Sequence, residues 1–264
     1  MKVLIGCVSF TPVVFGFTKA EQDLHKAVTT EMIGNQGGNA TVPISFDLEA
    51  VKKALATGAN VNTMFPDIQN STVLHAAVVA NNLAGVEFLL KNKANVNIKN
   101  ANGDTPGHIA ARQAILNILD ILIKNGVDLK IKNKDGKTIP EVLLVGASGR
   151  IGGNQGGNAT TSTPLNLEAT KKALELGANI NTVLFDSYTL LHQAVKSNDA
   201  AAIEFLLKNK ANVNARDVDG NTPAHIAAQQ GNKTIVDLLA KYGADLKIKN
   251  KEGKTAKDLL AVPM

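Results

Sequence analysis

The chain has 264 residues, of which 44% are hydrophobic and 19% are charged, a composition typical of a folded protein and not of a disordered one. Aromatic residues make up 4% and tryptophan is absent, so the core has to be built from Leu, Ile, Val and Ala, as in closely stacked helices and not in a large single-core enzyme. The net charge of +5 comes from lysines scattered among Asn, Asp and Glu without interleaved aromatic residues, which disfavours nucleic-acid binding. The single cysteine, Cys7, excludes an intramolecular disulfide and a cysteine-based zinc cluster.

The first twenty residues have the pattern of a secretory signal peptide. Lys2 precedes a mostly apolar stretch of 15 residues, 3–17, and residues 18–20 end on a small residue suited to cleavage. The stretch contains a proline and a glycine and is shorter than the about 20 apolar residues of a membrane-spanning helix. We therefore expect residues 1–20 to be a signal peptide and the protein to be secreted or exported; it is cytoplasmic if the segment is not cleaved. A loosely packed N-terminal arm is the alternative.

Two segments of the first half return in the second half. Residues 34–41 recur as 153–160 with an offset of 119, and residues 88–97 recur as 205–214 with an offset of 117. The chain therefore consists of duplicated halves, about 21–145 and 146–264. The difference between the offsets places a two-residue insertion or deletion near Phe65.

A shorter period of 33 residues runs inside each half. It separates His75 from His108 and His192 from His225. The clearest copy begins Asp219-Gly220-Asn221-Thr222-Pro223-Ala224-His225, continues with apolar residues at helical spacing, and ends on Gly243-Ala244-Asp245. This copy resembles the ankyrin-repeat family, in which a β-turn opens each unit, Thr-Pro-x-His begins the first helix and Gly-Ala-Asp closes the second.

Each part of this copy has a local cause. Asp-Gly supplies a turn with positive φ, Thr222 caps the first helix, Pro223 occupies a first turn where no N–H is needed, and Gly243 provides a left-handed cap. The resemblance implies an all-α solenoid of stacked helix-turn-helix pairs with β-turn tips. Following its register through residues 21–264 predicts about six and a half repeats, the last of them a truncated, polar cap.

Units one and four carry Gly/Asn-rich inserts between their two helices, near residues 33–46 and 146–164. A solenoid accommodates such inserts as loops on one face. The residues from Thr138 to Val145 supply the first helix that residues 167–176 would otherwise lack, which favours one continuous stack. A linker between two separate three-repeat domains remains the alternative.

The sequence predicts no catalytic site, metal site or cofactor. All five histidines (His25, His75, His108, His192 and His225) are assigned to one motif position, where the resemblance implies hydrogen bonds within and between units. Residues one repeat apart cannot converge on one catalytic centre. The glycine-rich inserts lack the Lys-Ser/Thr pair and the preceding strand of a phosphate-binding loop. We therefore expect a protein that is not an enzyme.

Two turn tips carry large apolar residues where the register expects polar ones. They contribute Met64, Phe65 and Ile68 in the first half and Leu184, Phe185 and Tyr188 in the second. If exposed, these residues form an interface hot spot. If they fold back onto the inserts, they only cover them. Two other tips, residues 130–137 and 247–254, are basic and are interpreted as solvated turns, since no aromatic platform for nucleotide bases accompanies them.

The resemblance also implies that a concave surface, formed by the tips and the exposed side of the first helices, recognises partners. The residues that it places there are Val79, Arg112, Gln113, Lys196, Gln229 and Gln230. Their mixed chemistry suits a protein surface better than a small-molecule pocket. We expect binding of a partner protein whose identity the sequence does not name, with the further hypothesis of an exported bacterial protein acting on a host. A scaffold that forms homo-oligomers through the apolar tips is the alternative.

Overall fold

The computed structural model describes residues 16–29, 46–149, 164–184 and 187–260. The chain divides into two compact units, Met1–Asn95 and Val96–Met264. In the described residues the regular secondary structure consists of thirteen α-helices and one 3-10 helix, without a β-strand. The first fifteen residues of the expected signal peptide, most of both inserts and Phe185 lie outside the described residues. The described helices confirm the all-α class.

Unit 1 contains two helix pairs. Its elements are α1 (Lys19–Lys26), α2 (Leu48–Ala56), the 3-10 helix η1 (Pro66–Ile68), α3 (Val73–Val79) and α4 (Leu83–Lys91). Helix α1 packs on α2 and α3 packs on α4. Leu24, Leu74 and Leu89 are completely covered.

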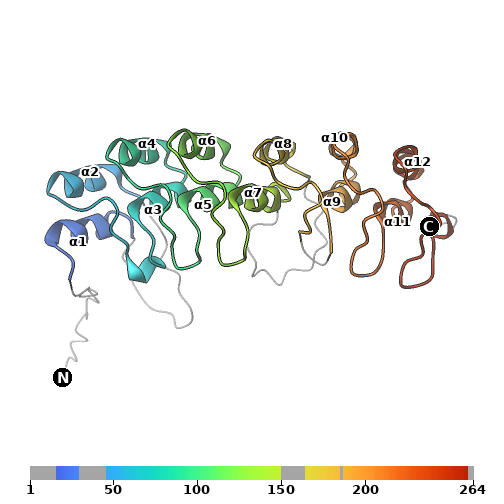
Figure 1. Ribbon diagram of the computed structural model, residues 1–264, viewed down its shortest axis with the longest axis horizontal. Helices are drawn as coiled ribbons and strands as arrows, with labels where there is room; N and C mark the ends of the chain where they lie inside the picture. Colours follow the sequence, from blue (N-terminus) through green and yellow to red (C-terminus); the bar gives the residue numbers. More distant parts are fainter. Residues whose placement is uncertain (1–15, 30–45, 150–163, 185–186, 261–264) are drawn as a thin grey trace, which may run out of the picture. The chain divides into compact units, whose positions relative to one another are not determined.

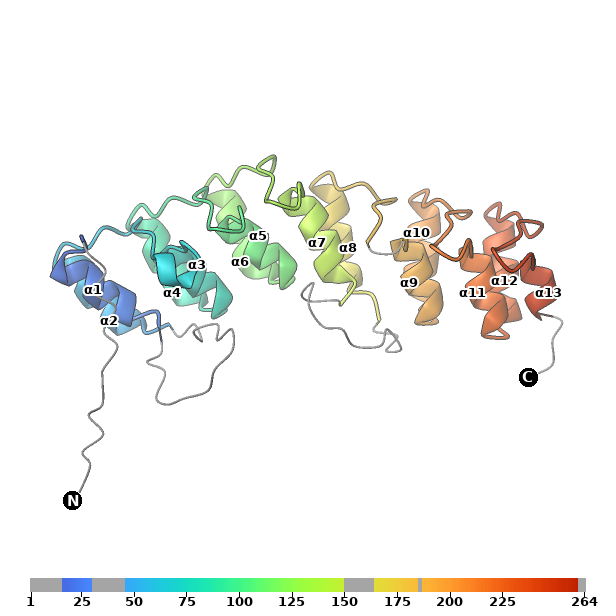
Figure 2. The same cartoon turned by 90° about the horizontal axis from the view of Figure 1, so that it is seen from below.

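Unit 2 contains four further helix pairs and a final single helix. Its elements are α5 (Pro106–Arg112), α6 (Leu116–Lys124), α7 (Ile139–Ala147), α8 (Leu167–Glu175), α9 (Leu190–Lys196), α10 (Ala200–Lys208), α11 (Pro223–Gln229), α12 (Lys233–Lys241) and α13 (Ala256–Leu260). Within this unit the first helices of the pairs form one row and the second helices another (Figure 1). The loops that lead into α7, α11 and α13 lie along one edge of the unit in both views (Figure 2). Six pairs and a truncated seventh match the six and a half repeats expected.

A threonine begins each first helix by capping it. In α5, the Thr105 backbone N–H donates to Nδ1 of His108 at 3.2 Å, and the Thr105 Oγ1 lies 2.8 Å from the same nitrogen. Because Nδ1 accepts a hydrogen bond, Nε2 carries the proton and donates to the carbonyl of Lys137 in the next repeat at 3.2 Å. His192 and His225 donate in the same way to the carbonyls 29 residues further on. Each of these histidines therefore joins a helix cap to the neighbouring tip.

The assignment of His25 to this motif position is wrong. Thr18 caps α1, and the side chain that completes its capping box is Glu21, which accepts from the Thr18 N–H at 2.9 Å. Helix α7 uses the same Thr-x-x-Glu box, with Thr138 and Glu141. His25 lies one helical turn later, and its Nε2 is 2.7 Å from a carboxylate oxygen of Asp67. A carboxylate at the third helical position replaces histidine there because both accept from the cap N–H.

Asparagines join the tips of successive repeats. In unit 2, the Asn97 Oδ1 accepts from the backbone N–H of Asp128 at 2.8 Å, and its Nδ2 donates to the carbonyl of Gly126. Asn214 makes the equivalent pair of bonds with Asp245 and Gly243. These bonds pair backbone groups that no helix can reach, which accounts for the recurring asparagines.

The junction of the duplicated halves lies inside unit 2. Helix α7, from the first half, packs on α8, from the second, and Lys172 of α8 forms an ion pair of 2.6 Å with Asp120 of α6. Helix α7 runs to Ala147, so Gly146 lies in the helix and not in the insert. A Cβ on Gly146 would lie 2.5 Å from the carbonyl oxygen of Ala111, so α7 approaches α5 closely at this point. These contacts favour the continuous stack for this part of the chain.

Candidate protein-binding surface

The apolar tip of unit 1 is covered, so the exposed alternative is wrong for Phe65 and Ile68. Phe65 is 0% exposed, its ring 5.6 Å from that of Phe17 and 5.0 Å from that of His25. Ile68 is 5% exposed, at the end of η1. Met64 is the one predicted residue of this tip that faces solvent, at 39%. Phe65 and Ile68 therefore belong to the core of unit 1.

The extra two residues of this tip explain the difference. The Phe65 N–H donates to the carbonyl of Ser71, whereas in unit 2 the Leu184 N–H donates to the carbonyl of Tyr188, only four residues on. The longer loop forms η1, and its Asp67 meets His25 while Phe65 packs against α1 and the residue before its cap. The unexpected partner is Phe17, which lies within the expected signal peptide.

The apolar tip of unit 2 is partly open. Val183 is 53% exposed, and Leu184 and Tyr188 are half-buried. The ring of Tyr188 lies 4.9 Å from that of His192, and the Lys196 Nζ lies 6.0 Å from the Tyr188 centroid. Tyr188 and Lys196 therefore lie next to each other.

Arg112 is engaged inside the protein. Its two terminal nitrogens lie 2.9 and 3.0 Å from the two carboxylate oxygens of Asp104, a side chain that is 2% exposed. Asn133 donates to the same carboxylate at 3.0 Å. The guanidinium neutralises a buried charge, and both of its terminal nitrogens are already paired inside the protein although the side chain is 33% exposed. Gln113 next to it is half-buried, as is Val79 in unit 1.

The second half of unit 2 presents a different surface at the same positions. Gln229 and Gln230, at the end of α11, are exposed, and the Gln230 amide donates to the backbone carbonyl of Lys196 at 2.8 Å. Helices α9 and α11 pack on each other. We call Tyr188, Lys196, Gln229 and Gln230 the α9–α11 surface.

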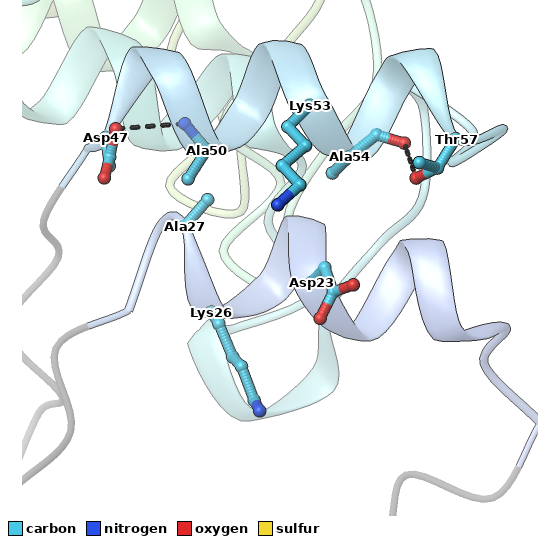
Figure 3. Close-up of a pocket in the computed structure, with 8 residues that line it drawn as sticks. All are labelled: Asp23, Lys26, Ala27, Asp47, Ala50, Lys53, Ala54 and Thr57. Atoms are coloured by element: carbon cyan, nitrogen blue, oxygen red, sulfur yellow. Dashed lines mark hydrogen bonds between the residues drawn. The ribbon is translucent and has the colours of Figure 1, made fainter.

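A hollow between α1 and α2 was not expected from the sequence. It has a volume of about 450 Å³ and is lined by Asp23, Lys26, Ala27, Asp47, Ala50, Lys53, Ala54 and Thr57 (Figure 3). Its alanines are too small to fill the space between the helices. Its polar groups have local partners: Asp47 caps α2, Thr57 donates to the carbonyl of Ala54, and Lys19 binds Asp23 at 2.6 Å and lowers the pKa of that carboxyl. No polar group of this hollow points to a particular ligand.

Among the described residues, no group of three or more His, Cys, Asp or Glu side chains is placed to hold a metal ion. The helices described are also too short or too polar for any of them to cross a membrane.

The repeat architecture agrees with known proteins. A family model for ankyrin repeats, three copies long, matches residues 43–133 and again residues 160–250. The chain belongs to the ankyrin-repeat family. Ankyrin repeats generally mediate protein–protein interaction, and their fold is typically a non-enzymatic binding scaffold. Comparison with curated proteins gave no match.

Three solved structures illustrate the likeness of this ankyrin-repeat chain to others. The ankyrin repeat domain of human ASB11 is 27% identical with a TM-score of 0.56, over 82% of this chain and 87% of that one. The ankyrin repeat domain of Bcl-3, a member of the IkappaB family, is 25% identical with a TM-score of 0.55, over 81% and 89%. A chain in the complex of the predatory endopeptidase Bd0816 from Bdellovibrio bacteriovorus with immunity protein Bd3460 is 29% identical with a TM-score of 0.54, over 72% and 91%.

Proposed function

We propose that this ankyrin-repeat chain binds a partner protein through the α9–α11 surface. The observation that carries the proposal is the contrast between equivalent positions of two repeats. Arg112 of α5 forms an ion pair with the buried Asp104, whereas the equivalent Gln229 of α11 is exposed. The Lys196 ammonium lies beside the Tyr188 ring and the Gln230 amide binds the Lys196 carbonyl, so an aromatic ring, a cation and an amide adjoin, a mixture that suits a protein interface.

The test compares two double variants of the full chain. Lys196→Ala/Gln229→Ala removes contacts from the α9–α11 surface, and Glu204→Gln/Asp237→Asn changes exposed residues of the second helices α10 and α12 as a matched control. Proteins retained by each immobilised variant are quantified by mass spectrometry. A partner lost with the first variant and kept with the second supports the proposal. Identical sets of retained proteins would place the binding site elsewhere.

Self-assembly is the second candidate. Val183 and Val218, at successive tips of unit 2, are 53% and 45% exposed, which favours it. The burial of Phe65 and Ile68 removes two of the residues on which it first rested. Sedimentation of the full chain at rising concentration tests it, and a constant monomer mass would exclude it.

We further propose that the chain is exported and that its partner belongs to a host cell. The support is the charged and apolar pattern of the N-terminus. The start of α1 adds a constraint, because cleavage after Ala20 would remove the Thr18 cap and the Phe17 ring that covers Phe65. We expect the mature protein to begin at or before Phe17. N-terminal sequencing of the protein from cells and medium decides this, and a mature form that retains Met1 would contradict export by this signal.

A further inference from the structure

The two basic tips of unit 2 are near-identical in sequence and in exposure pattern. Residues 129–138 and 246–255 differ only where Asp135 is replaced by Glu252. In both, exposed lysines alternate with half-buried or buried side chains. We call Lys130, Lys132 and Lys134 the first lysine row, and Lys247, Lys249 and Lys251 the second lysine row. The alternation places the three ammonium groups of each row on the solvent side of its loop.

An asparagine in the middle of each row fixes the local backbone. The Asn133 Oδ1 accepts from the backbone N–H groups of Asp135 and Lys137, at 3.0 and 3.1 Å, and Asn250 makes the same two bonds in the second row. The Asn133 side chain also donates inward to Asp104. Each tip is therefore a closed turn tied to the preceding repeat.

The preceding tip supports each row with a cation. The Lys99 Nζ donates to the carbonyl of Lys132 at 3.0 Å, and Arg216 donates to the carbonyl of Lys249 at 2.8 Å. The same neighbouring tips accept from the backbone N–H groups of Lys134 and Lys251. The middle of each row thus has a fourth positive charge beside it, and its backbone is held in place before any ligand arrives.

The row lysines form no ion pair within the described part of the chain, although Lys132 and Lys249 help to lower the pKa of the nearby Glu141 and Asp258 carboxyl groups. The ion pairs found in unit 2 use Lys172, Lys208, Lys233, Lys254 and Arg112, and none of the six row lysines. Six ammonium groups on fixed loops therefore remain for an external anion.

We propose that each lysine row binds a short acidic segment of the partner protein, an inference that rests on the proposed function. An extended segment with carboxylates on alternate residues presents them all to one side, as a lysine row requires. Carboxylates of this chain close both ends of each row, Asp128 and Asp135 in the first and Asp245 and Glu252 in the second. They repel a polyanion that continues past the row, and no aromatic side chain stands among the row residues to stack with bases, so a short acidic peptide fits better than a nucleic acid.

Two copies of the site on one chain permit bivalent binding. Because the rows are separated by three repeats of the same unit, a partner with two acidic segments could engage both, and the second contact would be intramolecular. An isolated acidic peptide should instead occupy the two rows independently.

The experiment uses the full chain and a fluorescent synthetic peptide in which Glu alternates with Thr. Fluorescence anisotropy and calorimetry should show two peptides per chain and an affinity that falls with salt. Replacing one row by glutamines (Lys130→Gln/Lys132→Gln/Lys134→Gln) should weaken binding to that row about tenfold and leave one peptide per chain. The matched control, Lys124→Gln/Lys208→Gln/Lys241→Gln, removes the same charge from the ends of second helices and should leave both sites intact.

Three results would overturn the proposal. The first is an equal loss of peptide affinity in the control variant, which would indicate an effect of net charge alone. The second is equal affinity for a peptide with Gln in place of Glu. The third is tighter binding of oligothymidylate or of phosphatidylserine vesicles than of the acidic peptide. Circular dichroism and urea unfolding confirm that each variant is folded. If the peptide fails while a partner still depends on Lys196 and Gln229, the lysine-row proposal is refuted and the proposed function stands.

Discussion

At the residue scale, equivalent positions of two repeats satisfy the same buried hydrogen-bond donor in two ways, with a charged pair in one repeat and with neutral amides in the other. Asp104, just before α5, and Arg112, at its end, correspond to Asn221 and Gln229 in the repeat of α11. Asp104 accepts from Asn133, and Asn221 accepts in the same way from Asn250 at 2.9 Å. The charged version needs the guanidinium because an unpaired carboxylate at this depth would be costly, while the amide version needs no counter-ion.

This comparison gives a prediction for Arg112. Arg112→Gln should lower the free energy of unfolding by about 2 kcal/mol, because it leaves a buried carboxylate without its counter-ion. The loss is smaller than for a fully buried ion pair because the guanidinium is partly exposed. Asp104→Asn/Arg112→Gln copies the pair of the α11 repeat and should recover most of the loss. Urea unfolding measures both variants. A double variant no more stable than the single one would show that the ion pair is not the cause.

At the element scale, close approach decides where helices need glycine. Gly146 of α7 faces the carbonyls of Ala111 and Arg112, whereas Gly107 of α5 faces the terminal methyl of Ile139. Backbone carbonyls of a packed helix cannot move aside, but a side-chain methyl can rotate. The two glycines therefore differ although both lie inside helices of unit 2.

For a change from glycine to alanine at Gly146, helix propensity predicts a gain in stability and packing predicts a loss. Alanine favours a helix over glycine by about 1 kcal/mol, but at Gly146 its Cβ should cost about 1–3 kcal/mol more than it gains. Gly146→Ala should lower the thermal midpoint, and Gly107→Ala should lower it clearly less. Calorimetry of the two variants decides. Equal effects would mean that α7 and α5 adjust their spacing freely.

The tip with η1 yields a further prediction. Phe65→Ala should destabilise unit 1 by about 3 kcal/mol, because it empties a completely covered site between Phe17 and His25. Met64→Ala, on the exposed neighbour, should change stability by less than about 0.5 kcal/mol. Urea unfolding monitored by circular dichroism compares the two. Equal and small effects would contradict the packing of Phe65.

At the scale of the whole molecule, buried histidines link stability to pH. Burial lowers the pKa of His108 and of His192, whose rings are completely covered. Hydrogen bonds from the Thr18, Thr138 and Thr255 backbones lower the pKa of Glu21, Glu141 and Asp258 respectively. The histidines make stability depend on pH near neutrality, and the carboxylates make it depend on pH below about 4.5.

The sign follows from which state binds more protons. Below the ordinary histidine pKa of about 6.5, the unfolded chain binds protons that the folded chain refuses, so stability present above this pH is lost as the pH falls. The loss should reach at most about 1.4 kcal/mol per pH unit for each histidine. His192→Gln keeps a side chain able to complete the capping box and should reduce the slope. Urea midpoints between about pH 8 and pH 5 test this, and an unchanged slope in the variant would exclude His192 as a source.

The amino-acid sequence by itself determined the 33-residue period, the helix pairs, their threonine caps and their number, because turn and cap chemistry acts within a few residues. Only the tertiary structure decided which predicted surface residues are available. Phe65 is covered by Phe17, 48 positions earlier, and Arg112 is bound to a buried carboxylate, while Lys99 and Arg216 support lysine rows in the next repeat. Likewise, only the capping of α1 by Thr18 and Glu21 shows that His25 does not occupy the motif position of the other histidines. Exposure depends on contacts between distant residues, and a repeat register specifies a position without specifying what covers it.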